Sequence, residues 1–120
     1  MKATLIDDYD KAMELMCKME AHLPIPARPT SALARSMREK GVQLAHDQEL
    51  EIQGVFYIGD AGGISCDVTS TQVAKEAIVV SLTQLRVHPK HPLVREIRAY
   101  QKKRTKRLAR AGRSGGVYRT

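Results

Sequence analysis

The strongest constraint on the fold is a change of hydrophobic pattern at residue 50, where apolar residues begin to recur at every second position. The alternation runs through residues 50–58, stops at a Gly- and Asp-rich segment (59–63) and resumes at 64–68. One face of these two segments carries Leu50, Ile52, Phe56, Ile58, Ile64, Cys66 and Val68, with Gly54 in the same row. Alternating segments joined by a short Gly-rich loop are typical of a β-hairpin. We therefore predict an antiparallel pair of strands at the centre of the chain.

Two amphipathic helices are predicted before this hairpin. In residues 8–21 the apolar side chains recur at three- and four-residue steps, and an Asp is available as the N-cap. Residues 31–40 show a similar pattern, and Gly41 provides a left-handed stop. The segment between them, 24–29, contains three prolines and is predicted to be a stiff, extended connector.

Residues 77–87 fit two patterns. Their density of β-branched side chains favours a third strand, whereas a helix over 71–86 is the alternative because some apolar residues also fit a helical step. With the strand, the chain is an α+β protein that combines two N-terminal helices, a three-stranded antiparallel sheet and a basic C-terminal helix. We expect a single domain over residues 1–111 and a flexible basic tail over 112–120.

The positive charge of the chain is concentrated at its C-terminal end. Of the 20 Lys and Arg residues, 8 lie in residues 101–120, a segment with no Asp or Glu. The first 100 residues hold the other 12 and all 13 acidic residues, so the formal net charge of +7 arises in the final segment. Like charges at this density repel one another, which favours an anionic partner.

A basic helix is predicted over about 91–111, with Pro92 in its first turn. Apolar residues occupy one arc of its helical wheel, and most of the cations occupy another. Glu96 is the last acidic residue, so no carboxylate side chain lies at helical spacing from the cations beyond Arg98. Although Arg104 falls in the apolar arc, it belongs to the predicted binding set. That set consists of Lys102, Lys103, Arg104, Lys106, Arg107 and Arg110.

These cations favour contact with the phosphate backbone of nucleic acid, without sequence preference. If about five of them contact duplex phosphates, log affinity should fall against log salt concentration with a slope of about −4 to −5. The candidates for stacking on bases are Tyr57 and Tyr100, so backbone contact with DNA or structured RNA is favoured over base recognition. The first alternative is a protein-interaction module that docks an acidic partner through the same helix. The second is a domain with no role in nucleic-acid binding, whose basic segment serves solubility alone.

Other chemistry is weakly indicated. His88 and His91 have H-x-x-H spacing, but no second Cys lies near Cys66 to complete a zinc site, and no metal or other cofactor is expected. The segment 59–63 lacks a dinucleotide or P-loop motif and is predicted to be a hairpin turn. Asp60, Asp67 and Ser65 have no recognisable catalytic partner in sequence. The sequence therefore favours a binding protein over an enzyme.

The predicted location is the cytoplasm. Cys17 and Cys66 both fall on apolar faces, which favours two buried, reduced thiols over a disulfide. No apolar run approaches the roughly 20 residues of a membrane span, and the first residues lack the apolar core of a signal peptide. We therefore expect no membrane contact. The open edges of a small sheet make a homodimer a further prediction.

Overall fold

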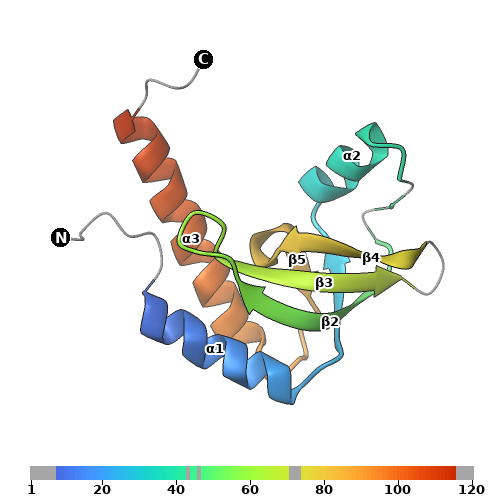
Figure 1. The fold of residues 1–120 in the computed structure, drawn as a ribbon, viewed down its shortest axis with the longest axis horizontal. Coiled ribbons are helices and arrows are strands. Elements are labelled where there is room, and N and C mark those ends of the chain that lie inside the picture. Colours follow the sequence, from blue (N-terminus) through green and yellow to red (C-terminus); the bar gives the residue numbers. More distant parts are fainter. Residues whose placement is uncertain (1–7, 43, 46, 71–73, 116–120) are drawn as a thin grey trace.

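The computed structural model describes residues 8–42, 44–45, 47–70 and 74–115, and it shows an α+β fold (Figure 1). In chain order the elements are α1 (Tyr9–Ala21), β1 (Ile25–Pro29), α2 (Ser31–Glu39), β2 (Leu50–Tyr57), β3 (Ile64–Ser70), β4 (Ala74–Ser81), the 3-10 helix η1 (Leu82–Gln84), β5 (Leu85–Val87) and α3 (Val94–Gly115). The predicted fold class is confirmed. The predicted three strands are wrong in number, because the described residues form one antiparallel sheet of five strands in the order β4-β3-β2-β1-β5.

Both N-terminal helices begin at side-chain caps. The Asp8 carboxylate accepts a hydrogen bond from Lys11 N at 3.3 Å, and the Thr30 hydroxyl accepts one from Leu33 N at 3.2 Å. Such caps satisfy amide groups that have no partner within the helix. The two helices form as predicted, but a strand separates them.

This strand, β1, is the proline-rich segment that was predicted to be a connector. It lies inside the sheet, with Ala27 opposite Leu50 of β2 on one side and opposite Val87 of β5 on the other. Proline has no amide hydrogen and is rare in inner strands. Here the carbonyl of Pro26 still accepts a hydrogen bond from His88 N at 3.3 Å. The alternate residues of β1 are buried against the core, and this burial offsets the missing donors.

The β2–β3 hairpin is confirmed, but half of β2 faces the opposite way from the prediction. Ile52 pairs with Val68 and Gly54 with Asp67, so an extra residue is inserted in β2 as a bulge. A bulge of one residue exchanges the two faces of a strand beyond it. As a result, Val55 is buried, whereas Phe56 and Ile58, the two apolar residues predicted to face the core, are exposed.

Residues 77–87 do not form one strand. β4 ends at Ser81, whose hydroxyl caps η1 through Thr83 N at 3.3 Å while Gln84 Oε1 accepts from Ser81 N at 2.9 Å. The chain then joins β5 at the opposite edge of the sheet. In a flat sheet these edges would lie about 19 Å apart, and a three-residue link spans roughly 13 Å at most. The sheet is therefore curled into a half-barrel.

The hydrophobic core fills the inner face of this curled sheet and is closed by helices. α1 contributes Ala12, Leu15 and Met19, and the start of α3 contributes Ile97. Cys66 of β3 lies in this core, as predicted, whereas Cys17 is exposed on α1, so its predicted burial is wrong.

α3 is longer than predicted, and its C-terminal half extends past the sheet (Figure 1). Residues 112–115, which were assigned to a flexible tail, continue this helix. Residues 116–120 lie outside the described part of the chain, so the division into a domain and a tail stays a prediction. In residues 105–110, every side chain except that of Arg107 is exposed to solvent.

Candidate functional site

The inner side of α3 is fixed by hydrogen bonds to the strand ends. The Tyr100 hydroxyl accepts from Ile64 N at 3.0 Å, and Gln101 Nε2 donates to the carbonyls of Leu82 (2.7 Å) and Leu85 (2.8 Å). These contacts fix the rotation of the helix about its own axis. They also use Tyr100, which the sequence suggested as a stacking residue, inside the fold.

Arg104 belongs to the same inner side. Its side chain is only 3 % exposed, and its guanidinium donates to the carbonyl oxygens of Asp60 (2.9 Å) and Ala61 in the β2–β3 loop. Two charge-assisted hydrogen bonds to backbone carbonyls compensate the burial of the charge. The structure thus places Arg104 away from the surface, as its position in the apolar arc indicates, and we leave it out of the candidate interface.

The glycine-rich loop is shaped to receive this arginine. Gly63 has φ +70°, and a Cβ added there would lie 2.6 Å from the Tyr100 hydroxyl oxygen and 2.7 Å from Arg104 Cζ. Only glycine permits both the backbone conformation and the close approach. The loop therefore serves as a docking point for α3, in keeping with the prediction that it is a hairpin turn.

The outer side of α3 carries five exposed cations. They are Arg95, Arg98, Lys102, Lys106 and Arg110, which we call the basic stripe. Their spacing of three and then four residues keeps them within an arc of about 120°. This arc is centred opposite the buried side of the helix and extends about 22 Å along the axis. In the described part of the chain, no carboxylate pairs with a stripe residue.

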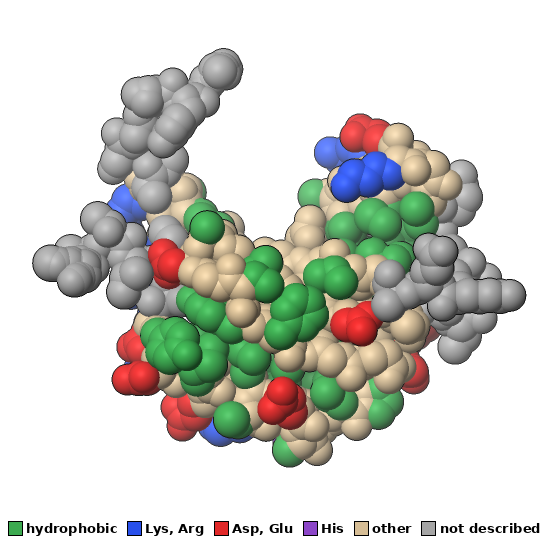
Figure 2. Space-filling view, viewed as in Figure 1, with side chains coloured by type: hydrophobic (Ala, Val, Ile, Leu, Met, Phe, Trp, Pro, Cys, Tyr) green, Lys and Arg blue, Asp and Glu red, His purple; other side chains and the backbone are tan. Residues whose placement is uncertain are grey.

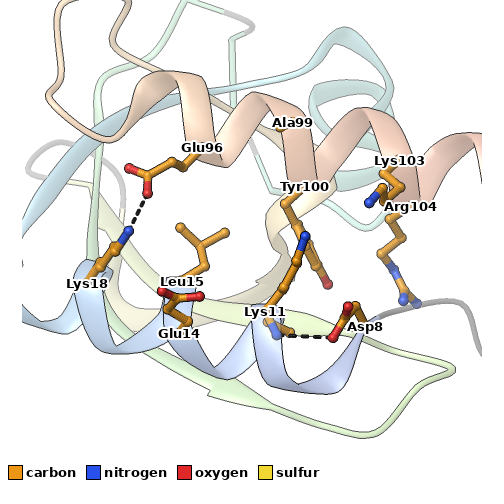
Figure 3. Close-up of a pocket in the computed structure, with 11 residues that line it drawn as sticks. Asp8, Lys11, Glu14, Leu15, Lys18, Glu96, Ala99, Tyr100, Lys103 and Arg104 are labelled. Atoms are coloured by element: carbon orange, nitrogen blue, oxygen red, sulfur yellow. Dashed lines mark hydrogen bonds and ion pairs between the residues drawn. The ribbon is translucent and has the colours of Figure 1, made fainter.

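Glu96, the only acidic residue of α3, points towards Lys18 of α1 (Figure 3). Its Oε2 lies 2.6 Å from Lys18 Nζ of α1, and the hydrogen bond to this carboxylate raises the pKa of Lys18. The pair lies along a groove of about 350 Å³ between α1 and α3. The groove is lined by both acidic and basic residues, so it has no strong preference for an anion. The one acidic charge of α3 is thus paired with a cation of α1.

The predicted binding residues are divided among four environments. Lys102, Lys106 and Arg110 lie on the basic stripe, whereas Lys103 lines the groove beside α1. Arg107 is partly buried and engaged in an interaction within the protein. Arg104 is buried, as described above. The sequence set omitted Arg95 and Arg98, although the three- and four-residue spacing back from Lys102 would have included both.

Both predicted stacking residues are partly buried and already make contacts within the protein. Tyr57 is partly buried and packs edge-to-face on Tyr9, with ring centroids 5.6 Å apart. The exposed aromatic ring of the sheet is Phe56, 37 % exposed on the outer face of β2. Figure 2 shows hydrophobic and acidic side chains on this view of the molecule and few basic ones. The face seen in Figure 2 therefore does not suit a phosphate backbone.

The histidines at the corner between β5 and α3 act as local caps. His88 Nδ1 accepts from Lys90 N at 3.1 Å, and His91 Nδ1 accepts from Leu93 N at 3.0 Å. Cys66 lies apart from them in the core, where burial raises the pKa of its thiol to about 12. Among the residues that the structure describes, no three His, Cys, Asp or Glu side chains are grouped to hold a metal ion.

Comparison with known proteins adds no relative. No protein family, curated protein or solved structure matches the chain. None of the helices in the described ranges combines the length and the apolar character needed to cross a membrane. The functional argument therefore depends on the geometry of α3 and its surroundings.

Proposed function

We propose that the protein binds nucleic acid without sequence preference, through contacts between the basic stripe of α3 and the phosphate backbone. The observation that carries this proposal is the row of five exposed cations on a helix whose only carboxylate is paired elsewhere. Each cation that neutralises a phosphate releases a condensed counterion, and this release drives binding. The Lys and Arg residues supply charge and hydrogen-bond donors but no base-specific geometry.

The shape of the stripe supports a backbone partner. The cations form one row that turns through about 120° along the helix. The C-terminal half of α3 extends beyond the sheet, where a duplex can approach it (Figure 1). The major groove of DNA is wide enough for an α-helix flanked by phosphates on both sides. Because Tyr57 and Tyr100 are partly buried and engaged in contacts within the protein, duplex DNA or structured RNA is favoured over unstacked bases. We place this activity in the cytoplasm, with both cysteines as free thiols.

The test is a triple neutralisation with a matched control. Lys102→Gln, Lys106→Gln and Arg110→Gln remove three stripe charges, and Arg35→Gln, Arg38→Gln and Lys40→Gln remove three exposed charges around α2. Both variants carry the same net charge. Substitutions are preferable to truncation after Gln101, which would also remove Arg104 from the loop.

Affinity for duplex DNA and RNA with 5′-hydroxyl ends is measured at several salt concentrations. The wild type should show a log–log slope of about −4 to −5, and the stripe variant a slope smaller in magnitude by about 3. The α2 variant should keep the wild-type slope. If the stripe and α2 variants lose affinity equally, general charge rather than the stripe is responsible and the proposal fails. Weak, salt-independent binding by the wild type would instead favour an acidic protein as the partner.

A further inference from the structure

A second cationic site shares Arg98 with the stripe and lies in a hollow of about 490 Å³ between β1, β5 and the first half of α3. Its charged lining includes Arg28 of β1, Arg86 of β5 and Arg98 of α3, while Pro26 and Pro89 contribute apolar walls. Three separate elements thus bring one guanidinium each to the same hollow. Its volume falls within the range of small-molecule sites.

Two of these arginines lie where their charges reduce the stability of the sheet. Arg28 and Arg86 are direct partners in the register of the two antiparallel strands, and both are exposed. Like charges directly opposite each other destabilise a sheet. A local conflict of this kind is expected at functional positions rather than at purely structural ones.

The acidic charge at the hollow is smaller than the basic charge. Among the described residues that line the hollow, Glu49 is the only acidic one. Its Oε2 accepts from Arg28 Nη2 at 2.9 Å, and its side chain is 66 % exposed. Arg86 Nε donates to the carbonyl of Pro29 at 3.2 Å, which orients its side chain. Arg98 forms no ion pair with any described residue. The three arginines and one glutamate leave a formal excess of two positive charges.

We propose that this hollow binds a phosphate monoester. Such a group carries close to two negative charges at neutral pH and several acceptor oxygens. Planar guanidinium groups bind phosphate oxygens in pairs, and the apolar walls can cover the rest of a small organic ligand. This site goes beyond the proposed function, because a free phosphorylated molecule needs no nucleic acid. The other source of the same chemistry is the terminal phosphate of a nucleic-acid strand.

Binding is tested with inorganic phosphate, AMP and adenosine by calorimetry. The variant Arg28→Gln with Arg86→Gln removes two guanidinium groups, and Arg35→Gln with Arg38→Gln on α2 is the control of equal charge. Phosphate and AMP should bind the wild type and the control with similar affinity. The hollow variant should bind them at least about tenfold more weakly, which is the factor for a lost charge-assisted hydrogen bond. If the double variant does not fold, the single variant Arg98→Gln at an exposed position replaces it. This variant should also bind phosphate and AMP more weakly than the wild type.

Duplexes with and without a 5′-phosphate separate the two sources of ligand. A preference for the phosphorylated duplex that disappears in the hollow variant identifies a nucleic-acid end, and AMP binding without such a preference identifies a free phosphate ester. The inference is overturned if adenosine binds as well as AMP, if neither phosphate nor AMP binds at millimolar concentration, or if the α2 control loses as much affinity. Failure here leaves the salt-dependent duplex binding of the stripe intact, and failure of the stripe leaves AMP binding intact.

Discussion

Replacing Arg104 by Met should destabilise the fold, although this residue belongs to the most basic segment of the chain. Its guanidinium donates to the carbonyls of Asp60 and Ala61, and its side chain is almost fully buried. Methionine keeps the unbranched stem and the helix propensity of the side chain but lacks the guanidinium group, so both donors are removed. The β2–β3 loop would then lose its attachment to α3.

The magnitude follows from the two lost hydrogen bonds. A hydrogen bond to a charged group contributes about 1.5–3 kcal/mol, and an acceptor left buried without a partner adds to the loss. Ala61 is exposed and Asp60 is partly exposed, so water can replace part of the lost donation. We therefore take the lower end for each bond, which gives about 3 kcal/mol in the free energy of unfolding. For a chain of this size that corresponds to a decrease of roughly 10–15 °C in Tm.

Urea denaturation followed by circular dichroism measures this loss, and Lys103→Met is the matched control. Lys103 is the neighbouring residue and is exposed, and the control removes the same charge, so it should change stability by no more than about 0.5 kcal/mol. Arg104→Lys should lie between the two variants, because one ammonium group does not reproduce the guanidinium fork. If Arg104→Met unfolds at the same urea concentration as Lys103→Met, the guanidinium does not hold the loop. Arg104 then returns to the set of candidate binding residues.

Two further predictions concern titratable side chains. Burial, with the charges of His22 and His88, lowers the pKa of His91, so the unfolded chain binds more protons than the folded protein just below the ordinary histidine pKa. The free energy of unfolding is therefore unaffected by this histidine above about pH 6.5 and decreases as the pH falls towards the lowered pKa. His91→Asn, which keeps an acceptor for Leu93 N, should make this decrease smaller in urea titrations at several pH values. A variant with the same pH dependence as the wild type would contradict this prediction. For the thiols, Cys17 should react with a disulfide reagent in the native protein, whereas Cys66, with its pKa raised to about 12 by burial, should react only after unfolding. Two fast-reacting thiols in the native protein would refute this assignment.

Some elements could be predicted because they depend on residues that are close together in the sequence. The β2–β3 hairpin and both N-terminal helices follow from periodicity and from capping residues. The faces of β2 beyond Ile52 were not predicted, because alternation was extended through a strand that contains a bulge. Gly54 was the available indication, since a glycine inside a strand often marks a bulge.

The two missing strands depend on distant parts of the chain. β1 contains Pro26 and Pro29, and local propensity argues against a strand there, yet it pairs with β2 and β5. β5 has only three residues and takes its place because the curled sheet brings its position close to the end of β4. Neither pairing can be inferred from a short window of sequence. The alternating burial of Ile25, Ala27 and Pro29 becomes recognisable only once their partners are known.

The basic stripe differs in membership from the set of binding residues that the sequence predicts, because a count of charges gives no direction. Composition treats Arg104 and Lys106 alike, while the structure turns one towards the β2–β3 loop and the other to solvent. The direction of the stripe follows from the inner contacts of Tyr100, Gln101 and Arg104, since they fix the rotation of α3. Because the stripe lies opposite these contacts, the buried Arg104 helps to orient the five cations that face solvent.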